Sequence, residues 1–93
     1  MHSSVRLARL LLQLAERFGS TDKDGVLVDL QVTHQELGEL IGANREAVTR
    51  AVDRLMDARV VTYRGRRLLL LKPEELKKSA EGRQTVSADT ARA

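Results

Sequence analysis

Four side chains between residues 45 and 50 have the chemistry needed to recognise DNA bases. Arginine can donate two hydrogen bonds to guanine, glutamate can accept one from the cytosine amino group, and threonine can contact a thymine methyl group. The candidates for these roles are Arg45, Glu46, Thr49 and Arg50. In a helix that starts near Asn44 they share one side, because residues three and four apart are neighbours on a helix surface. This spacing favours a base-reading helix, although charged outer helix faces are most often ordinary solvated surface.

Two short helices are predicted to position these side chains. Thr33 with Glu36 three residues later is a capping-box signature for the start of the first helix. Gly42 can adopt the left-handed backbone that ends a helix, and Asn44 can cap the next helix over residues 44–57. The apolar stripe of the first helix is Leu37, Leu40 and Ile41, and that of the second is Ala47, Val48, Ala51, Val52 and Leu55. The pattern predicts a helix-turn-helix.

The flanking segments predict the remainder of an α+β winged helix-turn-helix, in which a three-helix core carries a small antiparallel β-sheet and a β-hairpin wing. Residues 5–18 have helical apolar spacing and are predicted to pack behind the helix pair. Residues 20–25 read as a polar turn, and residues 26–32 alternate as a strand that leads into the cap at Thr33. Residues 60–63 and 68–71 favour strands joined by a basic connector at 64–67. Pro73 suits the start of a short closing helix.

The wing is also the most basic part of the chain. Of the net charge of +3, residues 60–72 carry +4, because Arg64, Arg66, Arg67 and Lys72 have no acidic neighbours there. Residues 20–32 carry −2 and residues 33–59 carry −1. Guanidinium groups pair with phosphate oxygens. We therefore expect the three arginines to contact the DNA backbone, with an ordinary charged turn as the alternative.

Composition limits the other classes of function. A chain of 93 residues with 42% apolar content fits one domain, predicted at 5–79, with a remnant at 1–4 and a disordered tail at 80–93. There is no cysteine, so disulfides and thiol chemistry are excluded. The histidines are His2 and His34, and we expect His34 to be an exposed first-turn residue. We expect no catalysis, no cofactor, no metal site, no membrane span and a cytoplasmic location.

Three stretches together resemble a known family. VRLARLLLQLAERF, VTHQELGELIGANREAVTRAVDRLMDARVV and YRGRRLLLLKPEEL resemble the C-terminal DNA-binding domain of Crp/Fnr transcription regulators, over about residues 5–77. The resemblance implies base contacts from Arg45, Glu46 and Arg50, with Thr49 as a nearby discriminator. It implies phosphate contacts near Thr33, Gln35 and Asn44, and wing contacts near Arg64, Gly65 and Arg66. The recognition pattern is similar to that of members preferring TGTGA-like half-sites.

The resemblance also implies partners. These are double-stranded DNA, a second copy in a parent homodimer, and RNA polymerase through a loop comparable to residues 19–25. The family's sensor barrel and dimerisation helix have no counterpart in this sequence, so we expect an excised domain rather than a stand-alone one. A winged helix that binds another protein is the alternative, and the slightly acidic segment 33–59 favours it modestly.

Overall fold

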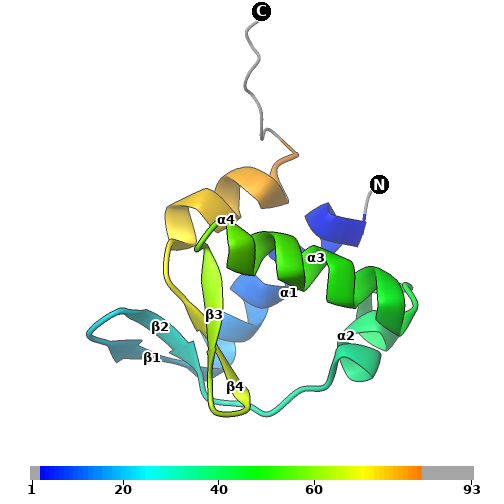
Figure 1. The fold of residues 1–93 in the computed structure, drawn as a ribbon. Helices are drawn as coiled ribbons and strands as arrows, with labels where there is room; N and C mark the ends of the chain where they lie inside the picture. The colour runs from blue at the N-terminus through cyan, green and yellow to red at the C-terminus, as the bar shows by residue number, and fades with distance from the viewer. Residues whose placement is uncertain (1–2, 83–93) are drawn as a thin grey trace, which may run out of the picture.

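The computed structural model describes residues 3–82, which form four helices and one four-stranded antiparallel sheet (Figure 1). In chain order the elements are α1 (Ser3–Phe18), β1 (Gly19–Asp22), β2 (Gly25–Val28), α2 (His34–Ile41), α3 (Arg45–Asp57), β3 (Val61–Arg64), β4 (Arg67–Leu70) and α4 (Pro73–Ala80). The predicted winged helix-turn-helix fold is confirmed. His2 and nearly all of the predicted tail lie outside the described residues. No helix within residues 3–82 is long and apolar enough to cross a membrane.

The turn between α2 and α3 forms as the sequence predicts. The Thr33 hydroxyl accepts a hydrogen bond from the Glu36 amide at 3.0 Å, and the Glu36 carboxylate accepts one from the Thr33 amide at 2.8 Å. Gly42 ends α2 in the left-handed conformation, with φ 74° and ψ 36°. Asn44 Oδ1 then accepts a hydrogen bond from the Ala47 amide at 2.8 Å. Because these bonds satisfy amides that a helix start leaves unpaired, both helices begin at the predicted caps.

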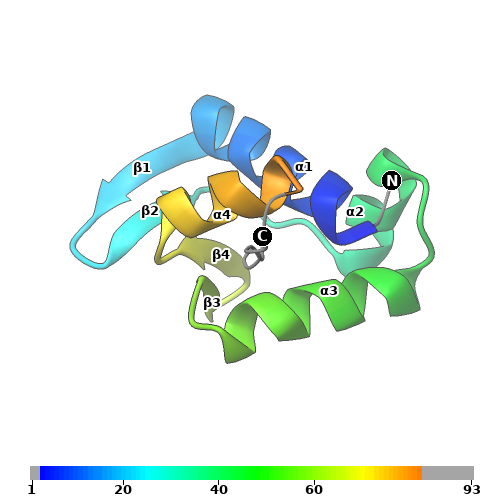
Figure 2. The same ribbon diagram turned by 90° about the horizontal axis from the view of Figure 1, so that it is seen from above.

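The core lies between α1, α3 and the sheet, and α4 closes it along α1 (Figure 2). The largest fully buried side chains are Leu7, Leu11, Val28, Leu37, Val48, Val52, Val61, Leu69, Leu70 and Leu76. The guanidinium Nε of Arg9 donates to the carbonyl oxygen of Ala80 at 2.9 Å, which ties the end of α4 to α1. α4 ends at Ala80, one residue beyond the predicted end of the domain at residue 79.

Leu40 departs from the predicted apolar stripe of α2. Its exposed fraction is 64%, whereas Leu37 is fully buried. The reason is that α2 has only eight residues and turns one narrow face, at Leu37 and Gly38, towards the core. At about 100° per residue, Leu40 falls outside that face.

The wing is the β3–β4 hairpin, and its turn is shorter than predicted. Arg64 lies opposite Arg67 in the strand register, so only Gly65 and Arg66 form the turn. Gly65 has φ 64°, the positive value that two-residue hairpin turns require. The predicted four-residue connector was therefore wrong at both ends, and its two outer arginines belong to the strands.

Residues 19–32 also fold differently from the prediction. The predicted polar turn at 20–25 is a hairpin in which β1 pairs with β2 around Lys23 and Asp24. The predicted strand over 26–32 ends at Val28, where the chain leaves the sheet to reach the cap of α2. β1 has the sequence GSTD, which has no apolar alternation, so periodicity could not reveal it. Its strand conformation comes from pairing with β2.

Candidate nucleic-acid interface

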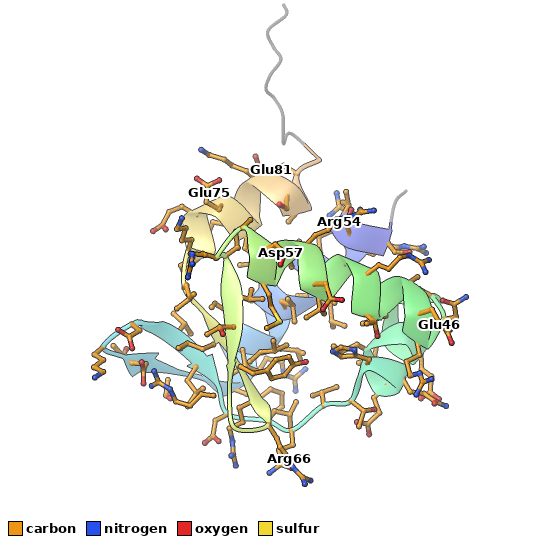
Figure 3. All side chains as sticks on the ribbon, viewed as in Figure 1. Glu46, Arg54, Asp57, Arg66, Glu75 and Glu81 are labelled. Atoms are coloured by element: carbon orange, nitrogen blue, oxygen red, sulfur yellow. The ribbon has the colours of Figure 1, made fainter. Side chains whose placement is uncertain are left out.

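The four candidate base-reading residues lie together on the first two turns of α3. Arg45, Glu46 and Arg50 are exposed and Thr49 is half-buried. Together with His34 they line one open hollow of about 430 Å³. Figure 3 shows Glu46 on the outer side of α3 near its start. The hollow is therefore bounded by side chains that can both donate and accept hydrogen bonds.

The two charged residues at the start of this face form only a weak pair. Arg45 Nη2 lies 3.9 Å from Glu46 Oε2, and both side chains are 65% exposed. Exposed pairs of this kind contribute little, about 0 to 1 kcal/mol. Both groups thus remain available to a ligand.

His34 is not the exposed residue that the sequence predicts. It is half-buried, and its Nδ1 lies 2.9 Å from Thr49 Oγ1 while its Nε2 lies 2.9 Å from the Tyr63 hydroxyl. In a neutral imidazole one nitrogen donates and the other accepts, and a hydroxyl can complement either. Burial raises the pKa of Tyr63, and the Asp53 carboxylate raises it further. His34 thereby joins the first turn of α2 to α3 and to the wing.

The candidate phosphate-binding residues of the helix pair lie at the two helix starts. Thr33 and Asn44 use their side-chain oxygens to accept the capping hydrogen bonds. The Thr33 hydroxyl hydrogen and the Asn44 amide hydrogens can still donate. Gln35 is exposed beside Thr33. Because helix starts carry partial positive charge, these donors suit an anionic oxygen.

The wing arginines differ in their surroundings. Arg66 is exposed and projects from the wing tip (Figure 3), and it makes no ion pair with another residue of the described part, 3–82. Arg64 pairs with Asp22 at 2.5 Å and with Asp24 at 3.0 Å. Arg67 Nε donates to Asp29 Oδ1 at 2.7 Å. Of the three expected phosphate ligands, only Arg66 is thus presented without a carboxylate partner from the described residues.

These carboxylate partners were missed by reasoning from the sequence. The segment 20–32 carries −2 and the wing segment carries +4. These opposite charges were the one feature of the sequence that could have predicted the ion pairs. Strand pairing brings the two segments together, since β2 and β4 are neighbours in the sheet. A hydrogen bond from the Asp24 amide lowers the pKa of Asp22, and Arg64 lowers it further. Hydrogen bonds to Asp24 and Asp22 raise the pKa of Arg64.

Known proteins resemble this chain in both sequence and fold. The family model for the Crp-like helix-turn-helix domain matches residues 5–79. The global nitrogen regulator of Synechococcus elongatus is 34% identical over 71 residues, which cover 76% of this chain and 32% of that protein. The CRP-like cAMP-activated global transcriptional regulator of Mycobacterium tuberculosis is 33% identical over 75 residues, covering 81% of this chain and 34% of that protein.

The solved structures agree with this match. A transcriptional regulator of the CRP/FNR family from Thermus thermophilus superposes with a TM-score of 0.75 at 29% identity, over 87% of this chain and 41% of that one. The chain spans about a third of the length of the curated relatives it matches.

Proposed function

Because the chain belongs to the family of Crp-like helix-turn-helix domains, which bind DNA in transcription regulators, we propose that α3 enters the major groove and reads bases there. The observation that carries the proposal is the grouping of Arg45, Glu46, Thr49 and Arg50 around one open hollow on α3. A recognition helix needs such a row of exposed donors and acceptors at its start. The relatives are regulators of transcription rather than enzymes.

The proposed target is a TGTGA-like half-site. Arg45 and Arg50 would each read a guanine, and Glu46 would accept a hydrogen bond from a cytosine amino group. Thr33, Gln35, Asn44 and the wing residues Arg64, Gly65, Arg66 and Arg67 would face the backbone, and among the wing arginines Arg66 is the one without a carboxylate partner within residues 3–82. Backbone contacts fix the register of the protein on the duplex and carry no sequence information themselves.

Two further partners and a cellular location belong to this proposal. The parent protein would act as a homodimer on two half-sites. Residues 19–25, which form most of the β1–β2 hairpin and are largely exposed, would face RNA polymerase. The site of action would be the cytoplasm, where such a regulator meets the chromosome.

Replacing the base-reading arginines tests the proposal directly. The duplexes are one with TGTGA half-sites and a scrambled duplex of the same composition, each titrated at two salt concentrations. We expect the unmodified chain to prefer the first duplex. Arg50→Ala should lose roughly 1 to 3 kcal/mol of that preference, because a bidentate contact carries about this much discrimination.

Arg66→Ala is the matched control. This change removes a backbone contact, so it should weaken binding to both duplexes equally and reduce the salt dependence. Equal weakening of both duplexes by Arg50→Ala would reject its base-reading role. A complete lack of salt-sensitive binding by the unmodified chain would instead favour a protein-binding winged helix.

A further inference from the structure

The β1–β2 hairpin holds one wing arginine with two carboxylates. Arg64 donates through Nη1 to Asp22 Oδ1 and through Nη2 to Asp24 Oδ2. The guanidinium group thus directs two of its nitrogens at one hairpin. Asp22 is better enclosed than Arg64, because the exposed fraction of its side chain is 18% against 44% for the side chain of Arg64.

One of the two acids is held in place independently of Arg64. Asp22 Oδ2 accepts a hydrogen bond from the Asp24 amide at 3.0 Å, so the hairpin turn itself fixes the Asp22 carboxylate. Strand pairing between Asp22 and Gly25 closes the turn. A carboxylate that is already fixed loses little conformational freedom when it binds the planar guanidinium group.

A phosphate group would need the same donors. Carboxylate and phosphate oxygens bind a guanidinium through the same parallel N–H groups, so one arginine cannot serve both fully. The neighbouring Arg67 is similarly engaged by Asp29, whereas Arg66 at the turn has no such partner within residues 3–82. The hairpin would therefore compete with the DNA backbone for Arg64.

We propose that Asp22 and Asp24 are positioning residues that hold Arg64 away from the DNA backbone and leave Arg66 as the main phosphate contact of the wing. This inference rests on the proposed function, in which the wing lies on the backbone. Phosphate contacts strengthen binding to every sequence alike. Restraining Arg64 thus lowers non-specific affinity and leaves discrimination to α3.

A four-way comparison tests the inference. The proteins are the unmodified chain, the Asp22→Asn/Asp24→Asn variant, Arg64→Gln, and the triple variant that combines them. Each is titrated with the TGTGA-containing duplex and its scrambled counterpart across a salt series. Asparagine keeps the size of aspartate and an acceptor oxygen, so the hairpin turn retains its hydrogen bond from residue 24.

Freeing Arg64 should add one phosphate contact on both duplexes. The slope of log affinity against log salt should steepen by about 0.9, which makes the loss of affinity from about 50 to 200 mM salt roughly three- to fourfold larger. At the lowest salt, the double variant should bind both duplexes more tightly than the unmodified chain. In the Arg64→Gln background, the same two aspartate changes should leave the slope unaltered.

The background comparison separates the proposal from a general charge effect. Removing two negative charges strengthens DNA binding at long range whether or not Arg64 is present. An equal gain with and without Arg64 would therefore overturn the inference, as would weaker binding by the double variant. If the double variant fails to fold, Asp24→Asn alone breaks the more exposed pair and should give a smaller change of the same sign.

Failure of the underlying function has a different signature. If the unmodified chain shows no salt-sensitive binding to either duplex, the proposed function falls and this inference falls with it. If the unmodified chain binds and the four-way comparison shows no coupling between Arg64 and the acids, only the inference falls.

Discussion

Thr49 and His34 show how one residue's role depends on its neighbour. The Thr49 hydroxyl already bonds to His34 Nδ1, and the Thr49 methyl group offers an apolar contact for a base. A methyl group distinguishes thymine from cytosine through apolar contact with the thymine methyl. In the proposed complex, His34 would therefore contribute to the interface without touching DNA, because it is hydrogen-bonded to Thr49, which would contact a base.

Replacing His34 with alanine should cost stability at this junction. His34→Ala leaves the Thr49 and Tyr63 hydroxyls without their partner in a half-buried position, where an unsatisfied group costs about 1 to 3 kcal/mol. Tyr63→Phe removes only one of the two bonds and should cost less. The measurement is the free energy of unfolding from urea titrations.

The exposed neighbour Gln35 provides the control for His34. Gln35→Ala should change the free energy of unfolding by no more than about 0.5 kcal/mol, as is usual for surface changes. If His34→Ala cost no more than Gln35→Ala, the bridging role would be rejected. The double variant of His34 and Tyr63 should cost less than the sum of the single changes, because both remove one shared bond.

At the scale of the element, the α2–α3 turn depends on a backbone conformation rather than on a side chain. Gly42 has φ 74°, and a Cβ added there would meet only the Arg6 guanidinium at 3.7 Å, an ordinary contact distance. Any cost of substitution is therefore conformational. The left-handed region costs most L-residues roughly 1 to 2 kcal/mol, while asparagine visits it more readily.

Gly42→Ala should consequently destabilise the domain by about 1 kcal/mol, after allowing for the lower unfolded-state entropy of alanine. Gly42→Asn is the matched variant and should cost clearly less. Thermal unfolding followed by circular dichroism measures both. Equal losses in the two variants would show that something other than backbone conformation limits this position.

The elements also differ in how well their sequences reveal them. The caps at Thr33 and Asn44 and the turn at Gly42 act within four residues, so α2 and α3 could be predicted from the sequence. β1 could not, because a polar strand is defined by its partner strand. The wing turn was misjudged for a related reason, since only the register of β3 against β4 assigns Arg64 and Arg67 to the ladder.

At the scale of the whole molecule, one copy would present α3 as its one reading helix within residues 3–82 and would therefore cover one half-site. On palindromic DNA, two copies should lie about 34 Å apart, which is one helical turn. Footprinting on a palindrome with this spacing should protect both half-sites. Protection of a single half-site at saturation would contradict the expected symmetry.

The distance between the two half-sites provides the control for the expected one-turn geometry. Two chains joined by a flexible linker should bind the one-turn palindrome more tightly than either chain alone, because the second contact becomes intramolecular. Moving the half-sites apart by half a turn places them on opposite faces of the duplex. The gain from the linker should then shrink, and an unchanged gain would reject the geometry.

The sequence by itself determined α2 and α3 with their caps, the resemblance to the family and the row of candidate base contacts on α3. These depend on helical spacing and on hydrogen bonds between residues close in the chain. Only the tertiary structure decided which wing arginine has no carboxylate partner within residues 3–82 and which side chains His34 bonds to. Those roles depend on partners 15 to 42 residues away, at Thr49, Asp22 and Asp24, which strand pairing and helix packing bring within hydrogen-bond distance. The local sequence pattern does not predict such contacts, because side chains meet across a sheet only once the register of its strands is set.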